Sequence, residues 1–105
     1  MLVREDHEIR ESTLEYIGAE LEAFAAECDA LYLTLDIDVL PACEAPGVSA
    51  PAARGVRLEL LEPLLERLKA SGKLRLVDLA EINPEYDIDN RTAKAAARLI
   101  HLLSL

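Results

Sequence analysis

Three carboxylates in this chain stand where they could act on one ligand. Asp36 and Asp38 close the apolar run "LYLTLDID", and Glu81 closes a second run, "KLRLVDLAE". Residues two apart along a strand point to the same side, with Cα atoms roughly 6.5 Å apart, so Asp36 and Asp38 are expected to project toward one point. Converging carboxylates repel unless they share a proton or bind a cation. The spacing therefore suggests a divalent metal site, although a capping Asp beside a solvated Asp is the commoner meaning of this short pattern alone.

The segments around these residues predict an α/β fold. Helices are expected at 12–28, 58–72 and 91–105, and strands at 30–37 and 73–82. Strand, helix and strand in that order imply a parallel pair joined by a crossover. Both strands then end in acidic residues at one edge, where open parallel sheets bind their ligands.

Local signals set the expected ends of the helices. Ser12 with Glu15 has the spacing of a capping box, and Asp89 or Asn90 is expected to cap the last helix. Pro63 is expected in the first turn of the second helix, and Gly72 is expected to end that helix. The apolar stripe predicted for the first helix contains Leu14, Ile17, Leu21, Phe24 and Ala25.

A long connection separates the first strand from the second helix. It spans 39–57 and has no periodic pattern, and loops of this length within a small domain are usually functional. The strand before it shows little alternation of apolar and polar residues, which predicts cover on both faces.

Composition narrows the class of protein. The chain has 105 residues, with 20 acidic and 11 basic side chains and a net charge of −9, so nucleic acid and anionic membrane are poor partners. No apolar run is long enough for a bilayer, and the N-terminus is too charged for a signal peptide, so a cytoplasmic setting is expected. Cys28 and Cys43 are expected to be a partly buried thiol and a loop thiol rather than a bridge.

A longer pattern surrounds the paired aspartates. The text "TLDIDVLPACEAPGVSAPAARG" resembles the C-terminal signature of the ureohydrolase family, the group of arginase, agmatinase and formimidoylglutamase. The positions that fit the signature are Thr34, Asp36, Asp38, Ala42, Pro46, Gly47 and Gly55. Within the family, "VLPACEAPGVSAP" is most similar to the formimidoylglutamase branch, because arginases and agmatinases typically read "DPxxAPGTGTP" there.

The resemblance implies a fold and a chemistry. The chain would be the C-terminal segment of the three-layer arginase-like parallel-sheet fold, with the N-terminal remainder absent. Asp36 would bridge two Mn²⁺ ions and Asp38 would chelate one, and the ions would activate a hydroxide that attacks N-formimidoyl-L-glutamate to release L-glutamate and formamide. Glu81 would hold the cationic nitrogen of this small amidine, and no side chain of this segment is assigned a catalytic role beyond binding.

Arg54 is a weaker candidate for the substrate-binding site. Its guanidinium could meet the carboxylates of the substrate, although a solvated or capping arginine is the commoner case. The family's "GGDH"-like and "DAHxD"-like metal-binding stretches do not occur in this sequence, and His7 and His101 are expected at the surface. The segment alone is therefore expected to be inactive.

The partners and the alternatives follow from that incompleteness. Two strands leave both outer edges unpaired, so the segment is expected to associate with itself or a partner chain, and the whole enzyme to be a homo-oligomer. Arginase or agmatinase specificity is one alternative. A non-catalytic α/β binding or assembly module is the other.

Overall fold

Five main elements make up the chain, in the predicted order. The computed structural model describes residues 1–104. They form α1 (Leu14–Ala26), β1 (Leu31–Asp36), α2 (Leu58–Ala70), β2 (Leu74–Ala80) and α3 (Arg91–Leu103). Short 3₁₀ helices lie at Asp6–Glu8, Glu11–Thr13, Ile37–Val39 and Pro84–Tyr86. The last helix was expected to reach Leu105, which lies outside the described residues. Within 1–104, each helix is too short or too polar to cross a membrane.

The two strands form a parallel pair. Leu31 lies opposite Leu74 at one end of the pair, and Asp36 lies opposite Ala80 at the other. The α/β prediction is thereby confirmed, and both strands point their carboxyl ends toward the same edge.

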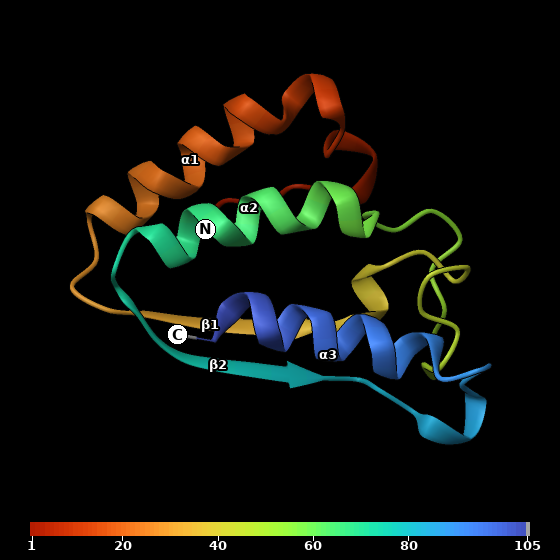
Figure 1. Ribbon diagram of the computed structural model, residues 1–105. Coiled ribbons are helices and arrows are strands. Elements are labelled where there is room, and N and C mark those ends of the chain that lie inside the picture. The colour runs from red at the N-terminus through yellow and green to blue at the C-terminus, as the bar shows by residue number, and fades with distance from the viewer. Residues whose placement is uncertain (105) are drawn as a thin grey trace.

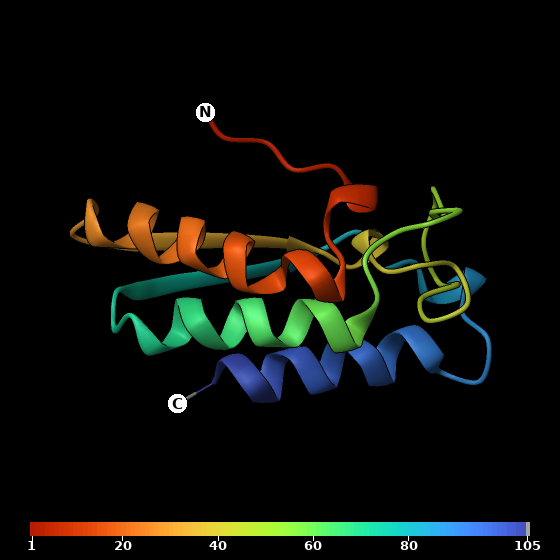
Figure 2. The same ribbon diagram turned by 90° about the horizontal axis from the view of Figure 1, so that it is seen from above.

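All three helices lie in one layer above one face of this sheet, with α2 between α1 and α3 (Figures 1 and 2). On β1, Leu31 and Leu35 face that layer and are buried. On the opposite face, Tyr32 is 59% exposed and its partner Leu76 is 58% exposed. We call this side the open face. The expectation of a strand covered on both faces was wrong, because within residues 1–104 only one layer of helices is present.

The core lies between the helices, the sheet and the loop that follows β1. Leu40, Ala45 and Val48 of that loop are almost completely buried, together with Ile37 in the turn before it. They form one cluster with side chains of β1, α2 and α3: Leu35, Leu65, Ala96, Leu99 and Leu103. The loop is therefore part of the hydrophobic core as well as a candidate for function.

The start of α1 differs from the prediction. Ser12 belongs to a 3₁₀ helix, and Thr13 precedes α1 without a side-chain capping bond. Glu15 reaches across to Arg67 of α2 instead of closing a capping box. Phe24, predicted on the buried stripe, is 58% exposed, because α1 buries only a narrow face toward α2. Tertiary contacts thus decide both features.

Helix α2 contains Pro63 in its second turn, so its expected place in the first turn was wrong. Proline has no N–H and leaves the carbonyl four residues earlier without a helical partner, at a cost of about 3 kcal/mol. Pro63 and Glu59 are exposed, so water can reach that carbonyl, and burial of Leu64 and Leu65 offsets the cost. Gly72 ends the helix region with φ of +72°, as predicted.

Candidate functional site at the carboxyl ends of the strands

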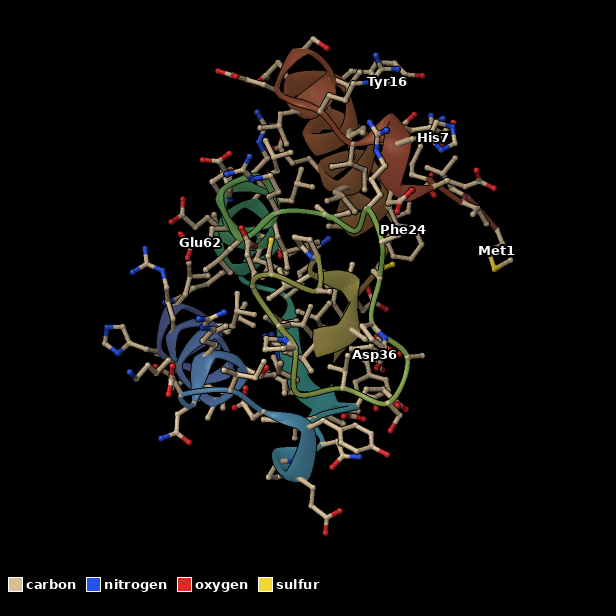
Figure 3. All side chains as sticks on the ribbon, turned by 90° about the vertical axis from the view of Figure 1, so that its right-hand side faces the viewer. Met1, His7, Tyr16, Phe24, Asp36 and Glu62 are labelled. Carbon is tan, nitrogen blue, oxygen red and sulfur yellow. The ribbon has the colours of Figure 1, made fainter. Side chains whose placement is uncertain are left out.

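The carboxyl ends of the strands bring Asp36 and Glu81 to one edge. Asp36 is the last residue of β1 and lies opposite Ala80, and Glu81 follows Ala80 directly. Figure 3 views the molecule from this end and shows Asp36 beside the loop that follows β1. The predicted meeting of the two acidic strand ends is confirmed at the level of the backbone.

Asp38 reaches the site through a turn rather than along the strand. β1 ends at Asp36, and Ile37–Val39 form a 3₁₀ helix closed by the Leu40 N–H donating to the Ile37 carbonyl at 3.2 Å. Ile37 is fully buried, whereas Asp36 is exposed and Asp38 is half-buried. Burial of Ile37 therefore anchors the turn, and the two aspartates flank that anchor on the solvent side.

The two aspartate carboxylates are available as ligands. Within residues 1–104, neither Asp36 nor Asp38 makes a side-chain hydrogen bond or an ion pair, and both are at least partly accessible. Carboxylate oxygens suit hard ions such as Mn²⁺ and Mg²⁺. However, no group of three or more His, Cys, Asp or Glu side chains within 1–104 could hold a metal. The donors fit such an ion in kind but supply only part of a coordination shell.

Glu81 has a strained backbone. Its φ is +71°, in the left-handed region that residues with a Cβ rarely adopt, and its side chain is exposed. Strain of this kind persists only where the surroundings enforce it, and it is often found at functional sites. The strand was expected to reach residue 82, but β2 ends at Ala80, because Glu81 turns the backbone out of the extended conformation.

The loop 39–57 is fixed to itself at its two ends. Pro41 and Ala52 form an isolated parallel bridge, and the Val56 N–H donates to the Val39 carbonyl at 2.7 Å. Gly55, with φ of +67°, lies so close to Pro41 that a Cβ would come within 2.6 Å of its nitrogen. The Gly55 N–H donates to the Asp6 carboxylate at 2.9 Å, which ties the N-terminal segment to the loop.

The remaining candidate side chains lie in solvent. Arg54 is exposed beside Gly55, and it forms no ion pair or hydrogen bond within the described residues. His7 and His101 are exposed, as predicted. Cys28 is half-buried and Cys43 is an exposed loop thiol, and both are free, which also agrees with the prediction. The structure therefore brings Arg54 to the loop of the site without giving it a protein partner.

Asp87 and Thr92 are part of this region in ways the sequence did not reveal. The Asp87 carboxylate accepts backbone N–H bonds from Ile88, Thr92 and Ala93 at 2.9–3.1 Å, and so caps α3. The expected cap at Asp89 or Asn90 was wrong, since Asn90 precedes α3 without a side-chain bond. Burial raises the pKa of Asp87, but the hydrogen bonds from Thr92, Ala93 and Ile88 outweigh it and hold that pKa below its usual value.

Comparison of the sequence with known proteins gives consistent results. Residues 1–105 match the arginase family. The chain is 58% identical over 98 residues to the formimidoylglutamase of Aeromonas hydrophila, covering 93% of this chain and 31% of that protein. It is 64% identical over 83 residues to the formimidoylglutamase of Nocardia farcinica, covering 79% of this chain and 27% of that protein. The chain thus spans about a third of the length of the relatives it matches.

Solved structures extend the comparison to the fold. An arginase from Bacillus subtilis matches 98% of this chain and 37% of its own chain, with a TM-score of 0.89 and 31% identity. A hypothetical agmatinase from Burkholderia thailandensis matches 94% of this chain and 31% of its own, with a TM-score of 0.80 and 28% identity. The helix and strand arrangement described above is therefore part of a larger known architecture.

Proposed function

Because the chain belongs to the arginase family, we propose that it is the C-terminal part of a manganese-dependent hydrolase that cleaves N-formimidoyl-L-glutamate to L-glutamate and formamide. The observation that carries the substrate assignment is the 58% identity to a formimidoylglutamase over 93% of this chain. Identity to the arginase and agmatinase structures is much lower, at 31% and 28%.

In this proposal Asp36 and Asp38 hold the metal. Their carboxylates make no protein contacts within the described residues and lie at the rim of the sheet, where both can face the same two metal ions. Two Mn²⁺ ions, when bound, supply an activated water for attack on the amidine carbon. The other ligands must come from outside residues 1–104, because two carboxylates cannot complete the coordination of a tightly held Mn²⁺.

Glu81 binds the cationic end of the substrate in this proposal. A formimidoyl group is an amidine and is protonated at neutral pH, so a carboxylate is a suitable partner for it. Glu81 follows the residue opposite Asp36, and this backbone position supports a role in binding a substrate at the same edge as the metal. Arg54, exposed on the adjacent loop, is free to meet the substrate's carboxylates.

The partner of this segment is the rest of an arginase-fold chain. Apolar side chains on the open face and a hollow of about 420 Å³ between β2 and α3, lined by Val77, Leu79, Ile100 and Leu103, need cover. Without its partner the segment is inactive and associates through these surfaces.

A chimera tests the proposed function. The matched segment of the Aeromonas hydrophila formimidoylglutamase is replaced by the present chain, and hydrolysis of formimidoylglutamate, arginine and agmatine is measured with and without Mn²⁺. We expect Mn²⁺-dependent release of formamide, with the highest kcat/KM for formimidoylglutamate.

Two variants of the chimera provide the controls. Asp36→Asn should lower activity and bound manganese together, because a metal ligand loses its charge, while Asp29→Asn, an exposed carboxylate before β1, should change neither. A higher kcat/KM for arginine or agmatine would overturn the substrate assignment and support the alternative specificity. Full activity and full metal content in Asp36→Asn would overturn the role of Asp36.

A further inference from the structure

Thr92 is the one buried polar side chain within residues 1–104, with no exposed surface. It lies in the first turn of α3, and its Oγ1 accepts a hydrogen bond from the Gly47 N–H at 2.7 Å. Gly47 belongs to the loop 39–57, so this bond joins α3 to the loop that follows Asp36 and Asp38. A buried hydroxyl in a helix needs a partner, and here the partner is the backbone of a distant loop.

The other side of Gly47 is bound just as closely. Its carbonyl accepts the Asn83 N–H at 2.6 Å, two residues after Glu81. A Cβ at position 47 would lie 2.8 Å from Cβ of Asp87 and 2.9 Å from Oγ1 of Thr92, so only glycine fits. One glycine therefore holds α3 on one side and the turn after Glu81 on the other.

Asp87 fixes the first turn of α3, which carries this hydroxyl. Its carboxylate accepts the backbone N–H groups of Ile88, Thr92 and Ala93 at 2.9–3.1 Å. These bonds hold the Thr92 backbone in the position from which Oγ1 accepts the Gly47 N–H. Hydrogen bonds that end on a carboxylate are stronger than neutral ones, so the link from Gly47 through Thr92 to Asp87 is held firmly.

We propose that Thr92 and Asp87 are positioning residues, which act through Gly47 and Asn83 to hold Glu81 in its left-handed conformation beside the metal-binding loop. We call these four residues the Gly47 clamp. The argument rests on the proposed function for the role of Glu81 itself. Its physical basis is independent, because a strained residue stays strained only when bonds on nearby backbone enforce it, and the Gly47–Asn83 bond lies two residues from Glu81.

Amide hydrogen exchange on the present chain tests the clamp without any activity. Thr92→Val keeps the shape of the side chain and removes its hydroxyl, Thr92→Ser keeps the hydroxyl, and Leu99→Val removes a methylene from the fully buried Leu99 of the same helix. We expect exchange at Gly47 and Asn83 to rise about tenfold or more in Thr92→Val, relative to the amides of β1. Thr92→Ser and Leu99→Val should leave that ratio near its original value.

Unchanged exchange at both amides in Thr92→Val, or an equal rise in Leu99→Val, would overturn the clamp. Asp87→Asn weakens the bonds that hold the Thr92 backbone and gives the same readout if Thr92→Val does not fold. These outcomes do not depend on whether the chain forms an enzyme.

The chimera described above measures the effect on the site. Misplacing Glu81 should weaken binding of the cationic substrate, so Thr92→Val should raise KM about tenfold or more with a smaller change in kcat, and Thr92→Ser should restore KM. Leu99→Val should leave KM unchanged. An unchanged KM in an active Thr92→Val chimera would overturn the positioning role, whereas an inactive parent chimera would count against the proposed function and leave the exchange result to decide the clamp.

Discussion

The loop beside the site and the sheet that carries it are built in opposite ways. Residues 39–57 have almost no regular structure, yet Leu40 and Ala45 are fully buried. β2 is a regular strand, yet Arg75, Leu76 and Val77 in its middle are exposed. In this chain, therefore, regular secondary structure and tight packing do not coincide. The irregular loop has reached its final packing, and the sheet still has a face and edges to cover.

Matched leucine truncations should give the largest contrast between these two regions. Leu40→Ala empties a fully enclosed site in the loop and should lower the free energy of unfolding by about 2–5 kcal/mol. Leu76→Ala on the open face should change it by within about 0.5 kcal/mol. Urea unfolding of the purified chain measures both.

The same pair in the chimera sharpens the contrast. There the open face is expected to be covered, so Leu76→Ala should become clearly destabilising while the cost of Leu40→Ala stays similar. Equal costs for the two substitutions in the isolated chain would show that the loop is no better packed than the sheet.

Substitutions at the two glycines with positive φ, Gly55 and Gly72, distinguish the cost of backbone strain from the cost of a steric clash. Both Gly55→Ala and Gly72→Ala place a Cβ in the left-handed region, which costs roughly 1–2 kcal/mol. Gly55→Ala also forces a Cβ against the backbone of Leu40 and Pro41, adding about 1–3 kcal/mol, whereas nothing lies within 4 Å at Gly72. Thermal unfolding should therefore give a lower Tm for Gly55→Ala, and the reverse order would contradict the tight loop.

Acid should lower the free energy of unfolding by protonating Asp87. Burial raises the pKa of Asp87, but hydrogen bonds lower it further, so the folded chain binds this proton less tightly than the unfolded chain. The stabilisation is therefore complete above the ordinary Asp pKa of about 3.9 and is lost as pH falls through the lower folded pKa. Asp87→Asn should remove this part of the pH dependence in urea titrations between about pH 6 and pH 2.5.

The exposed Asp89 nearby provides the control for that titration. Asp89→Asn should leave the acid dependence as it is in the original chain. A wild-type slope in Asp87→Asn would show that this carboxylate does not link α3 to pH.

A small effect is also expected from the hydrogen bond on the open face. The Tyr32 hydroxyl donates to the Asp78 carboxylate at 2.7 Å, but Tyr32 is largely exposed and water competes for both groups. Tyr32→Phe should lower the free energy of unfolding by less than about 1 kcal/mol. A larger loss in urea unfolding would mean that the open face is more ordered than its exposure indicates.

Local sequence patterns were sufficient to predict the helices and strands and the sheet edge where the candidate residues meet. The runs ending at Asp36 and Glu81 predicted parallel strands, and Gly72 predicted the end of α2. Each of these depends on residues close together in the chain. The signature around Asp36 then supplied what periodicity cannot, the identity of the family.

The missed features depend on contacts between distant segments. Thr92 binds Gly47, 45 residues away, and no local spacing reveals that bond. Glu15 was assigned to a capping box but pairs with Arg67, and Pro63 is tolerated inside α2 because its neighbours Leu64 and Leu65 are buried. In each case tertiary packing outweighs a local preference.

The parallel register of the sheet has a consequence for the order of folding. Every pairing between β1 and β2 joins residues separated by a complete loop and a complete helix, so no hairpin can start the sheet. The entropy of closing this connection must be overcome before any strand contact forms, which slows the search for the native state. Collapse of the loop around Leu40 shortens the effective connection, so the buried loop is well placed to act as the nucleus on which the strands later align.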